Sequence, residues 1–159
     1  KYVRQKVADA LLGFTGKGLS VNMRDGKVYV SLENSLLFAP GSWLVATNGQ
    51  LALENLAVVL AENKDVSVLV EGHTDNDVYR GYSQVKDNWD LSVMRATNVV
   101  KILTSNAGLD PKRITAAGRG EYVPLVENNS SENKAINRRT EIILTPDLTE
   151  LANLLDRAE

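Results

Sequence analysis

The sequence predicts an α/β fold, a two-layer sandwich in which helices cover a small sheet. The chain has 159 residues, of which 43% are hydrophobic and 24% charged, so it suits one globular domain with a substantial core. Some segments repeat apolar residues at helical spacing, whereas others alternate or run unbroken as strands do. Because the two kinds of segment follow one another along the chain, we expect helices packed on one side of a sheet.

Charge and composition exclude several classes of partner. Eighteen basic and twenty acidic side chains give a formal net charge of -2, which provides no global attraction to nucleic acid or to an anionic membrane. The lack of cysteine excludes disulfides, thiolate catalysis and cysteine-ligated metals. No apolar run has the length of a membrane helix, and the amino terminus lacks the apolar core of a signal peptide. Since the chain begins without Met and within a helical pattern, we expect a fragment of a longer protein.

The first element is expected to be the end of a linker helix over residues 1–16, which stops at the glycine-rich "GFTGKG". The predicted domain follows over residues 17–146. It opens with strands over 19–24 and 27–32, which flank Asp25-Gly26, the strongest short signal for a hairpin. The apolar residues at helical spacing in the first helix are Val3, Val7, Ala10, Leu11 and Phe14.

A turn, a helix and a buried strand come next. Pro40-Gly41 interrupts an apolar stretch and leads to a helix over roughly 47–62. "DVSVLVEGH" is an unbroken apolar strand, which is expected near the centre of the sheet. The polar loop 76–88 is long for a compact domain and is therefore a candidate for function. The residues expected on the buried face of the helix are Leu51, Leu53, Leu56, Val59 and Leu60.

The second half continues the alternation. A helix over about 89–106 is expected to end at Gly108, and strands are expected at "RITAAG" and "RTEIILTP". The segment between these strands is polar and turn-rich. Residues 147–159 are expected to form a C-terminal docking helix, because Asp147 and Glu150 have the spacing of a capping box and leucines follow at helical spacing. The residues expected on the inner face of the helix 89–106 are Val93, Ala96, Val100 and Leu103.

Three polar residues near the end of the buried strand are candidates for a binding site. Asp75 lies just past the strand, Arg95 lies in the second turn of the next helix, and Asn88 is placed to cap that helix. In α/β sheets, ligands usually bind beyond the carboxyl ends of the strands. Asp75 could bind an ammonium group and Arg95 a carboxylate, so the pair suits a zwitterion. The alternative is a salt bridge that only ties the strand to the helix.

The block "NRRT" adds two further cations. Arg138 and Arg139 open a strand and are expected to point to opposite faces, so that one reaches the pocket while the other braces loops. The alternative is a pair of solvated surface arginines.

Four sequence blocks, "VEGHTDN", "NWDLSVMRATNVVKIL", "RITAAGRGEYVPLVEN" and "NRRTEIIL", occur in this order. Together they resemble the peptidoglycan-associating domain shared by the OmpA carboxyl-terminal region, the Pal lipoproteins and the MotB stator proteins. The resemblance covers about residues 30–145. It implies a small mixed sheet covered by helices and a site for the diaminopimelate of the peptidoglycan stem peptide.

The resemblance also implies roles for single residues. Asp75 and Arg95 correspond to the residues that grip diaminopimelate, which keeps one free amino-acid end in the stem peptide. This correspondence favours the zwitterion over the salt bridge. Arg139 is expected to brace the neighbouring loops instead of contacting the ligand. The further ligand-binding residues that the resemblance implies are Thr74, Asn88, Leu91 and Arg138.

Two departures from the family pattern affect the rim of the expected pocket. The loop 76–88 is longer than in shorter family members, so a glycan could be contacted there. Gly41 offers only backbone where the family often has a polar side chain, and Ser42 could replace that contact. The residues considered for the rim are Gly41, Ser42, Tyr79 and Tyr82.

No catalytic site is expected. His73, the only histidine, lies two residues before Asp75, but zinc sites built from nitrogen and oxygen ligands usually need further histidines. A hydrogen-bond network at the strand end is the favoured role for His73. Trp43 and Trp89 are expected to pack rather than to bind sugars. We therefore expect no metal and no cofactor.

The resulting functional hypothesis is non-catalytic binding of peptidoglycan. The chain would be the periplasmic domain of an outer-membrane or cell-envelope protein, anchored through a segment outside this fragment, and would bind no nucleic acid. One alternative is a MotB-type, stator-like wall anchor. Others are a wall-processing hydrolase and a protein-interaction module that uses the leucine-rich tail. The oligomeric state stays open, with a homodimer among the alternatives.

Overall fold

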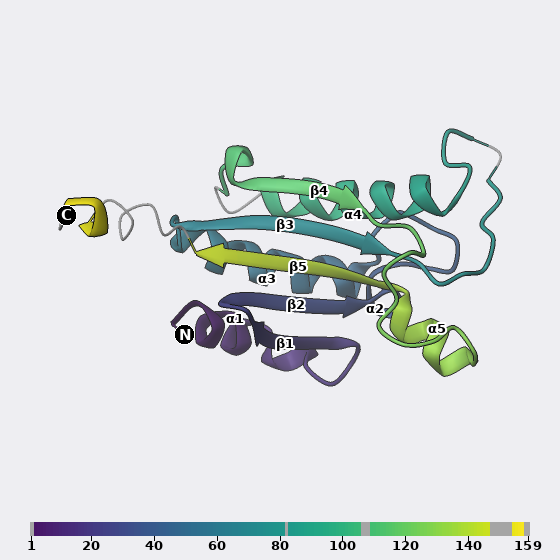
Figure 1. Ribbon diagram of the computed structural model, residues 1–159, viewed down its shortest axis with the longest axis horizontal. Helices are drawn as coiled ribbons and strands as arrows, with labels where there is room; N and C mark the ends of the chain where they lie inside the picture. Colours follow the sequence, from purple (N-terminus) through teal and green to yellow (C-terminus); the bar gives the residue numbers. More distant parts are fainter. Residues whose placement is uncertain (1, 82, 106–108, 147–153, 158–159) are drawn as a thin grey trace.

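The computed structural model describes residues 2–81, 83–105, 109–146 and 154–157. Five strands form one sheet in the order β1-β2-β5-β3-β4 (Figure 1). β3 and β4 are parallel, whereas the other neighbours are antiparallel, so the sheet is mixed. The strands are β1 (Leu19–Arg24), β2 (Lys27–Glu33), β3 (Val66–His73), β4 (Ile114–Gly118) and β5 (Arg139–Pro146).

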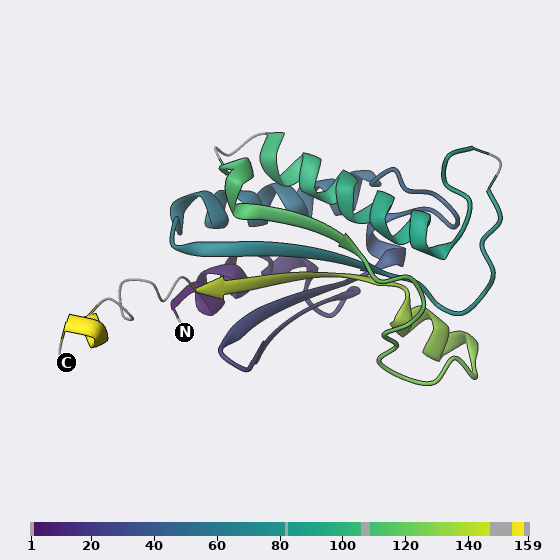
Figure 2. The ribbon, with the colours of Figure 1, turned by 45° about the horizontal axis from the view of Figure 1, so that its top comes forward.

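The longer helices α3 and α4 lie together on one face of the sheet, and α5 lies beyond its end (Figure 2). This arrangement confirms the predicted α/β fold with a mixed sheet covered by helices. None of the described helices is long and apolar enough to cross a membrane. The helices are α1 (Tyr2–Ala10), α2 (Asn34–Leu37), α3 (Thr47–Glu62), α4 (Asn88–Ser105) and α5 (Ser131–Asn137), with short 3-10 turns at Leu12–Phe14 and Pro111–Arg113.

The predicted hairpin is confirmed. Asp25 and Gly26 both have positive φ, 51° and 75°, as a two-residue hairpin turn requires. Arg24 pairs with Lys27 across the turn, and alternate residues of β2 face the core. β3 is paired on both sides, which fits its unbroken apolar sequence.

The first helix packs on the same core as the sheet. Val7 and Leu11 are fully buried in the core cluster, and α1 contacts α3 and β1. Val3 and Phe14 are partly buried against the same cluster. The apolar spacing of this segment therefore predicted the packed face of the helix.

Two predicted inner-face residues are exposed, and these predictions were wrong. Leu51 in α3 is 49% exposed and Val93 in α4 is 41% exposed. The other predicted inner residues are buried or pack against the core, and the small residues Ala52 and Ser92 take the inward positions in place of Leu51 and Val93. Small side chains at these positions let the helices approach the core closely, which a search for large apolar residues does not detect.

Two glycines bring the first turns of α4 against the sheet. Gly72 in β3 pairs with Gly118 in β4, and both lie beneath α4. A Cβ on Gly72 would overlap the Ser92 carbonyl oxygen, and one on Gly118 would lie 2.7 Å from the Val93 nitrogen. The glycine of "VEGHTDN" is therefore explained by this close approach. It places Arg95, one turn further along α4, near the end of β3.

Two other predictions need correction, and two further ones are not tested. The segment before β5 contains α5, whose first turn is capped by Ser130 through its oxygen and the Asn133 N–H, 3.1 Å apart. The cap of α4 is Asp87, which accepts from the Asp90 N–H at 2.9 Å, and not Asn88. The expected cap at Gly108 and most of the expected docking helix lie outside the described residues. Residues 154–157 are helical, but Leu154 and Leu155 are exposed rather than docked.

Candidate functional site

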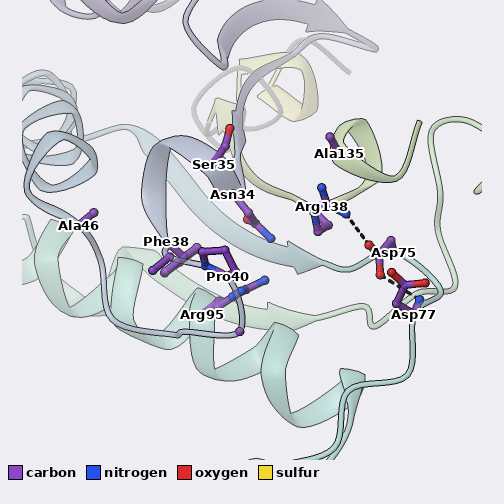
Figure 3. A pocket seen from close by; sticks show the side chains of 12 residues that line it. Asn34, Ser35, Phe38, Pro40, Ala46, Asp75, Asp77, Arg95, Ala135 and Arg138 are labelled. Atoms are coloured by element: carbon purple, nitrogen blue, oxygen red, sulfur yellow. Dashed lines mark hydrogen bonds and ion pairs between the residues drawn. The ribbon is translucent and has the colours of Figure 1, made fainter. Parts of the chain in front are cut away.

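A pocket of about 620 Å³ lies at the end of the sheet where β3 ends. Helix α2 and the segment after it, the segment after β3, and helices α4 and α5 surround it (Figure 3). It contains both a carboxylate pair and a pair of guanidinium groups beside an apolar wall. Its lining residues are Asn34, Ser35, Phe38, Ala39, Pro40, Gly41, Ala46, Asp75, Asp77, Arg95, Ala135 and Arg138.

Asp75 provides the buried negative charge of the pocket. The residue is 5% exposed, and its Oδ2 lies 2.6 Å from a terminal nitrogen of Arg138. Its Oδ1 accepts a hydrogen bond from the Asp77 N–H at 2.9 Å. Because each carboxylate oxygen can accept more than one hydrogen bond, both oxygens keep capacity for a ligand ammonium group.

Arg95 provides a buried cation that forms no ion pair with any residue the structure describes. Its Nε donates to the Ser42 carbonyl oxygen at 2.8 Å, and the side chain lies over the Phe38 ring at 5.0 Å. Within the described ranges, its terminal nitrogens form no hydrogen bond or ion pair. The residue is 5% exposed, and burial lowers the pKa of its guanidinium to about 10. A ligand carboxylate that accepts two parallel hydrogen bonds from the guanidinium would offset the free-energy cost of its burial.

The structure contradicts the simple salt bridge between Asp75 and Arg95. Asp75 pairs with Arg138 instead, and both arginines line the same pocket. Arg138 is the C-cap of α5 rather than a residue of β5, which begins at Arg139. Arg139 is 2% exposed and points away from the pocket, where it donates to Glu141 and to the carbonyl oxygens of Asn137 and Val123. As expected, one arginine, Arg138, reaches the pocket, while Arg139 holds neighbouring backbone segments together.

Several expected site residues lie behind the pocket wall rather than on it. The Thr74 hydroxyl donates to the Asp75 carbonyl oxygen, and the Asn88 amide donates to the Asp77 carbonyl oxygen. Leu91 is buried but does not line the pocket. Ser42 contributes its carbonyl oxygen to Arg95, and its hydroxyl accepts from the Leu44 N–H. These residues hold the loop and the guanidinium in place.

Three polar lining residues were missed by sequence reasoning, namely Asn34, Ser35 and Asp77. Asp77 forms a 2.8 Å ion pair with Lys134 of α5, and this hydrogen bond raises the pKa of Lys134. Asn34 is 5% exposed and lies in the first turn of α2. The sequence did contain a signal for Asn34. It continues the alternation of β2 by two residues beyond Leu32, which places it on the core face although it is polar.

The aromatic residues near the long loop form a second, smaller cavity of about 150 Å³. Trp89 and Tyr122 stack with ring centroids 5.1 Å apart and are both more than half exposed. Tyr79 lines this cavity and also lies beside Gly41 of the main pocket. The expected rim position of Tyr79 is thus adjacent to the site, while Tyr82 lies outside the described residues. Trp89 packs on Tyr122 rather than in the core.

His73 belongs to a polar cluster on the sheet face opposite the helices. Its Nε2 lies 3.3 Å from Glu71 and 3.9 Å from Glu141. These three side chains are close enough to hold a metal ion, with ligand atoms within 4.8 Å of one another. However, Glu141 is already paired with Arg139 at 3.2 Å and with Arg24 at 3.6 Å. Because these cations oppose a metal ion, the hydrogen-bond network remains the favoured role.

The buried His73 predicts a stability that falls in acid. Burial, with Arg139 and Arg119 nearby, lowers its pKa from 6.5 to about 3. Between these values the unfolded state binds a proton that the folded state does not, so stability falls as pH falls below 6.5. We expect a loss of about 2 kcal/mol between pH 7 and pH 5.

Urea denaturation at a series of pH values measures this loss. His73 is the only histidine, so His73→Gln should abolish most of the slope in this window. An equal slope in the wild-type domain and the variant would show that other groups cause it.

Comparisons with known proteins agree with this fold. A sequence model described as the OmpA family matches residues 37–138. Motility protein B of Bacillus subtilis is 31% identical over 80% of this chain and 49% of its own length. The probable lipoprotein YiaD of Escherichia coli is 34% identical over 82% of this chain and 57% of its own length. This chain thus spans about half the length of these relatives. The solved cell wall anchor of the T6SS from Pseudomonas aeruginosa is 33% identical, with a TM-score of 0.80 over 90% of this chain and 99% of that one.

Proposed function

Because this chain belongs to the OmpA family, we propose that its main pocket binds peptidoglycan through the free zwitterionic end of diaminopimelate in the stem peptide. By this contact the domain tethers an outer-membrane or other envelope protein to the cell wall. The binding is non-catalytic, and the domain lies in the periplasm.

The buried, uncompensated Arg95 is the observation that carries the proposal. A guanidinium that is 5% exposed and has no counter-ion is costly unless an anion joins it. Asp75 lies in the same pocket and attracts the opposite charge. An ammonium and a carboxylate on one carbon atom satisfy both groups at once, which an ordinary carboxylic acid or amine does not.

The relatives support a role at the cell wall. One similar structure is described as a cell wall anchor, and one similar sequence as a lipoprotein. A MotB-type wall anchor is a second form of the same function, favoured by the similarity to Motility protein B. The two forms share the pocket and differ in the membrane segment that the domain holds to the wall.

A calorimetric or NMR titration with meso-diaminopimelate, alongside Nα-acetyl-lysine, tests the proposal. Nα-acetyl-lysine carries an ammonium group and a carboxylate, but on different carbon atoms, so it lacks the free amino-acid end. We expect saturable binding that prefers diaminopimelate, with a dissociation constant between ~10 μM and ~1 mM. Weak sites suffice for a tether, because many copies on one polymer raise the effective affinity. No response at tens of millimolar, with either this ligand or a stem peptide, would refute the proposal.

A further inference from the structure

The main pocket contains a buried side-chain amide whose hydrogen-bonding capacity is unused. Asn34 lines the pocket and is 5% exposed. Neither its Oδ1 nor its Nδ2 has a hydrogen-bond partner among the described residues. Buried amides are nearly always paired in native proteins, because removing them from water without a partner is unfavourable. Asn34 therefore needs an explanation outside the fold itself.

The backbone fixes Asn34 in this position. β2 pairs with β5 up to Glu33 and Arg139, and the Asn34 N–H then donates to the Arg138 carbonyl oxygen at 2.9 Å. Asn34, the first residue of α2, thus lies directly after β2 and beside Arg138, at the edge of the pocket. Figure 3 shows its amide directed into the pocket, on the side of Arg95 and Arg138.

The chemistry of an amide differs from that of the charged residues around it. Asp75 and Arg95 match the two charges of the zwitterion, and each forms stronger hydrogen bonds with an ion than a neutral amide does. Asn34 offers one neutral acceptor and one neutral donor group. A peptide group offers the complementary pair, a C=O and an N–H. Phe38, Pro40 and Ala46 line the same pocket and exclude water from such a contact.

We propose that Asn34 binds the peptide group that links diaminopimelate to the preceding residue of the stem peptide. The pocket would then have two subsites, a charged one for the free end and a neutral one for the peptide-linked end. This inference rests on the proposed function and deepens it, because it makes the peptide-linked form, rather than the free amino acid, the preferred ligand.

The test compares two probes, free meso-diaminopimelate and the tripeptide L-alanyl-γ-D-glutamyl-meso-diaminopimelate. We expect the wild-type domain to bind the tripeptide more tightly. Asn34→Ala should weaken tripeptide binding roughly tenfold, the loss expected for one or two neutral hydrogen bonds. Its affinity for free diaminopimelate should change less than about twofold, since the charged subsite is intact. Asn22→Ala removes an exposed amide of β1 that does not line the main pocket, so it is the matched control and should change neither affinity.

Stability gives a second, independent readout. If Asn34 serves the ligand, Asn34→Leu should leave the midpoint of urea unfolding unchanged or raise it, because it removes an unpaired buried amide. A clear decrease would show a structural role and overturn the inference. Equal weakening of both probes by Asn34→Ala, or no weakening of either, would also overturn it while the proposed function stands. If the wild-type domain binds neither probe, both proposals fail.

Discussion

Arg95→Lys is expected to weaken binding of meso-diaminopimelate by roughly 30- to 100-fold while the domain stays folded. Lysine keeps the positive charge but cannot form the two parallel hydrogen bonds that a guanidinium gives a carboxylate. Charge-assisted hydrogen bonds contribute about 1.5–3 kcal/mol each, and 1.4 kcal/mol is a factor of ten in affinity. Lysine also loses the Nε contact with the Ser42 carbonyl oxygen, which positions the group in the wild-type pocket.

NMR titration up to tens of millimolar ligand measures this loss, with the amide spectrum as the check on folding. Arg80→Lys is the matched control, since Arg80 is exposed in the long loop and does not line the main pocket. Asp75→Asn should weaken binding at least as much, because it removes the counter-charge of the ammonium and leaves Arg138 unpaired. If Arg95→Lys binds within about threefold of the wild type, the ligand carboxylate does not contact this guanidinium.

The sequence was most informative where the signals are local. The Asp25-Gly26 hairpin, the bounds of α3 and the start of β5 followed from turn chemistry and apolar periodicity alone. α5 was missed because its seven residues, five of them polar, carry little periodicity, although the Ser130 cap was visible in the sequence. The inward positions of Ala52 in α3 and Ser92 in α4 were missed. Small residues give no apolar signal, and their contact with the core is visible only in the packed structure.

The candidate site could be predicted in part for the same reason. Asp75 and Arg95 lie on consecutive elements, so their proximity followed from the crossover between β3 and β4. The Asp75–Arg138 ion pair joins residues 63 positions apart and depends on β5 lying next to β3. A sequence does not give that strand order without a resemblance to a family. Asn34 was missed because no pattern shows whether a buried amide finds a partner within the fold.

Arg139 should contribute more to stability than any other residue of the site region. Its guanidinium is 2% exposed and donates to Glu141 at 3.2 Å and to two backbone carbonyl oxygens. Burial lowers its pKa, and Glu141 opposes that effect. We expect Arg139→Met to reduce the free energy of unfolding by roughly 3–5 kcal/mol, because it leaves the buried Glu141 paired only with the half-exposed Arg24, 3.6 Å away.

The neighbouring arginine provides the matched control, measured by urea denaturation and by diaminopimelate titration. The Arg138 side chain is 41% exposed, and Asp75 keeps its hydrogen bond from the Asp77 N–H, so Arg138→Met should reduce the free energy of unfolding by less than Arg139→Met does. It should nevertheless weaken ligand binding, because Arg138 lines the pocket and holds Asp75 in place. Adjacent arginines would thus separate the two functions, one serving the fold and the other the ligand. A loss below about 1 kcal/mol for Arg139→Met would show that the buried cluster rearranges around the missing charge.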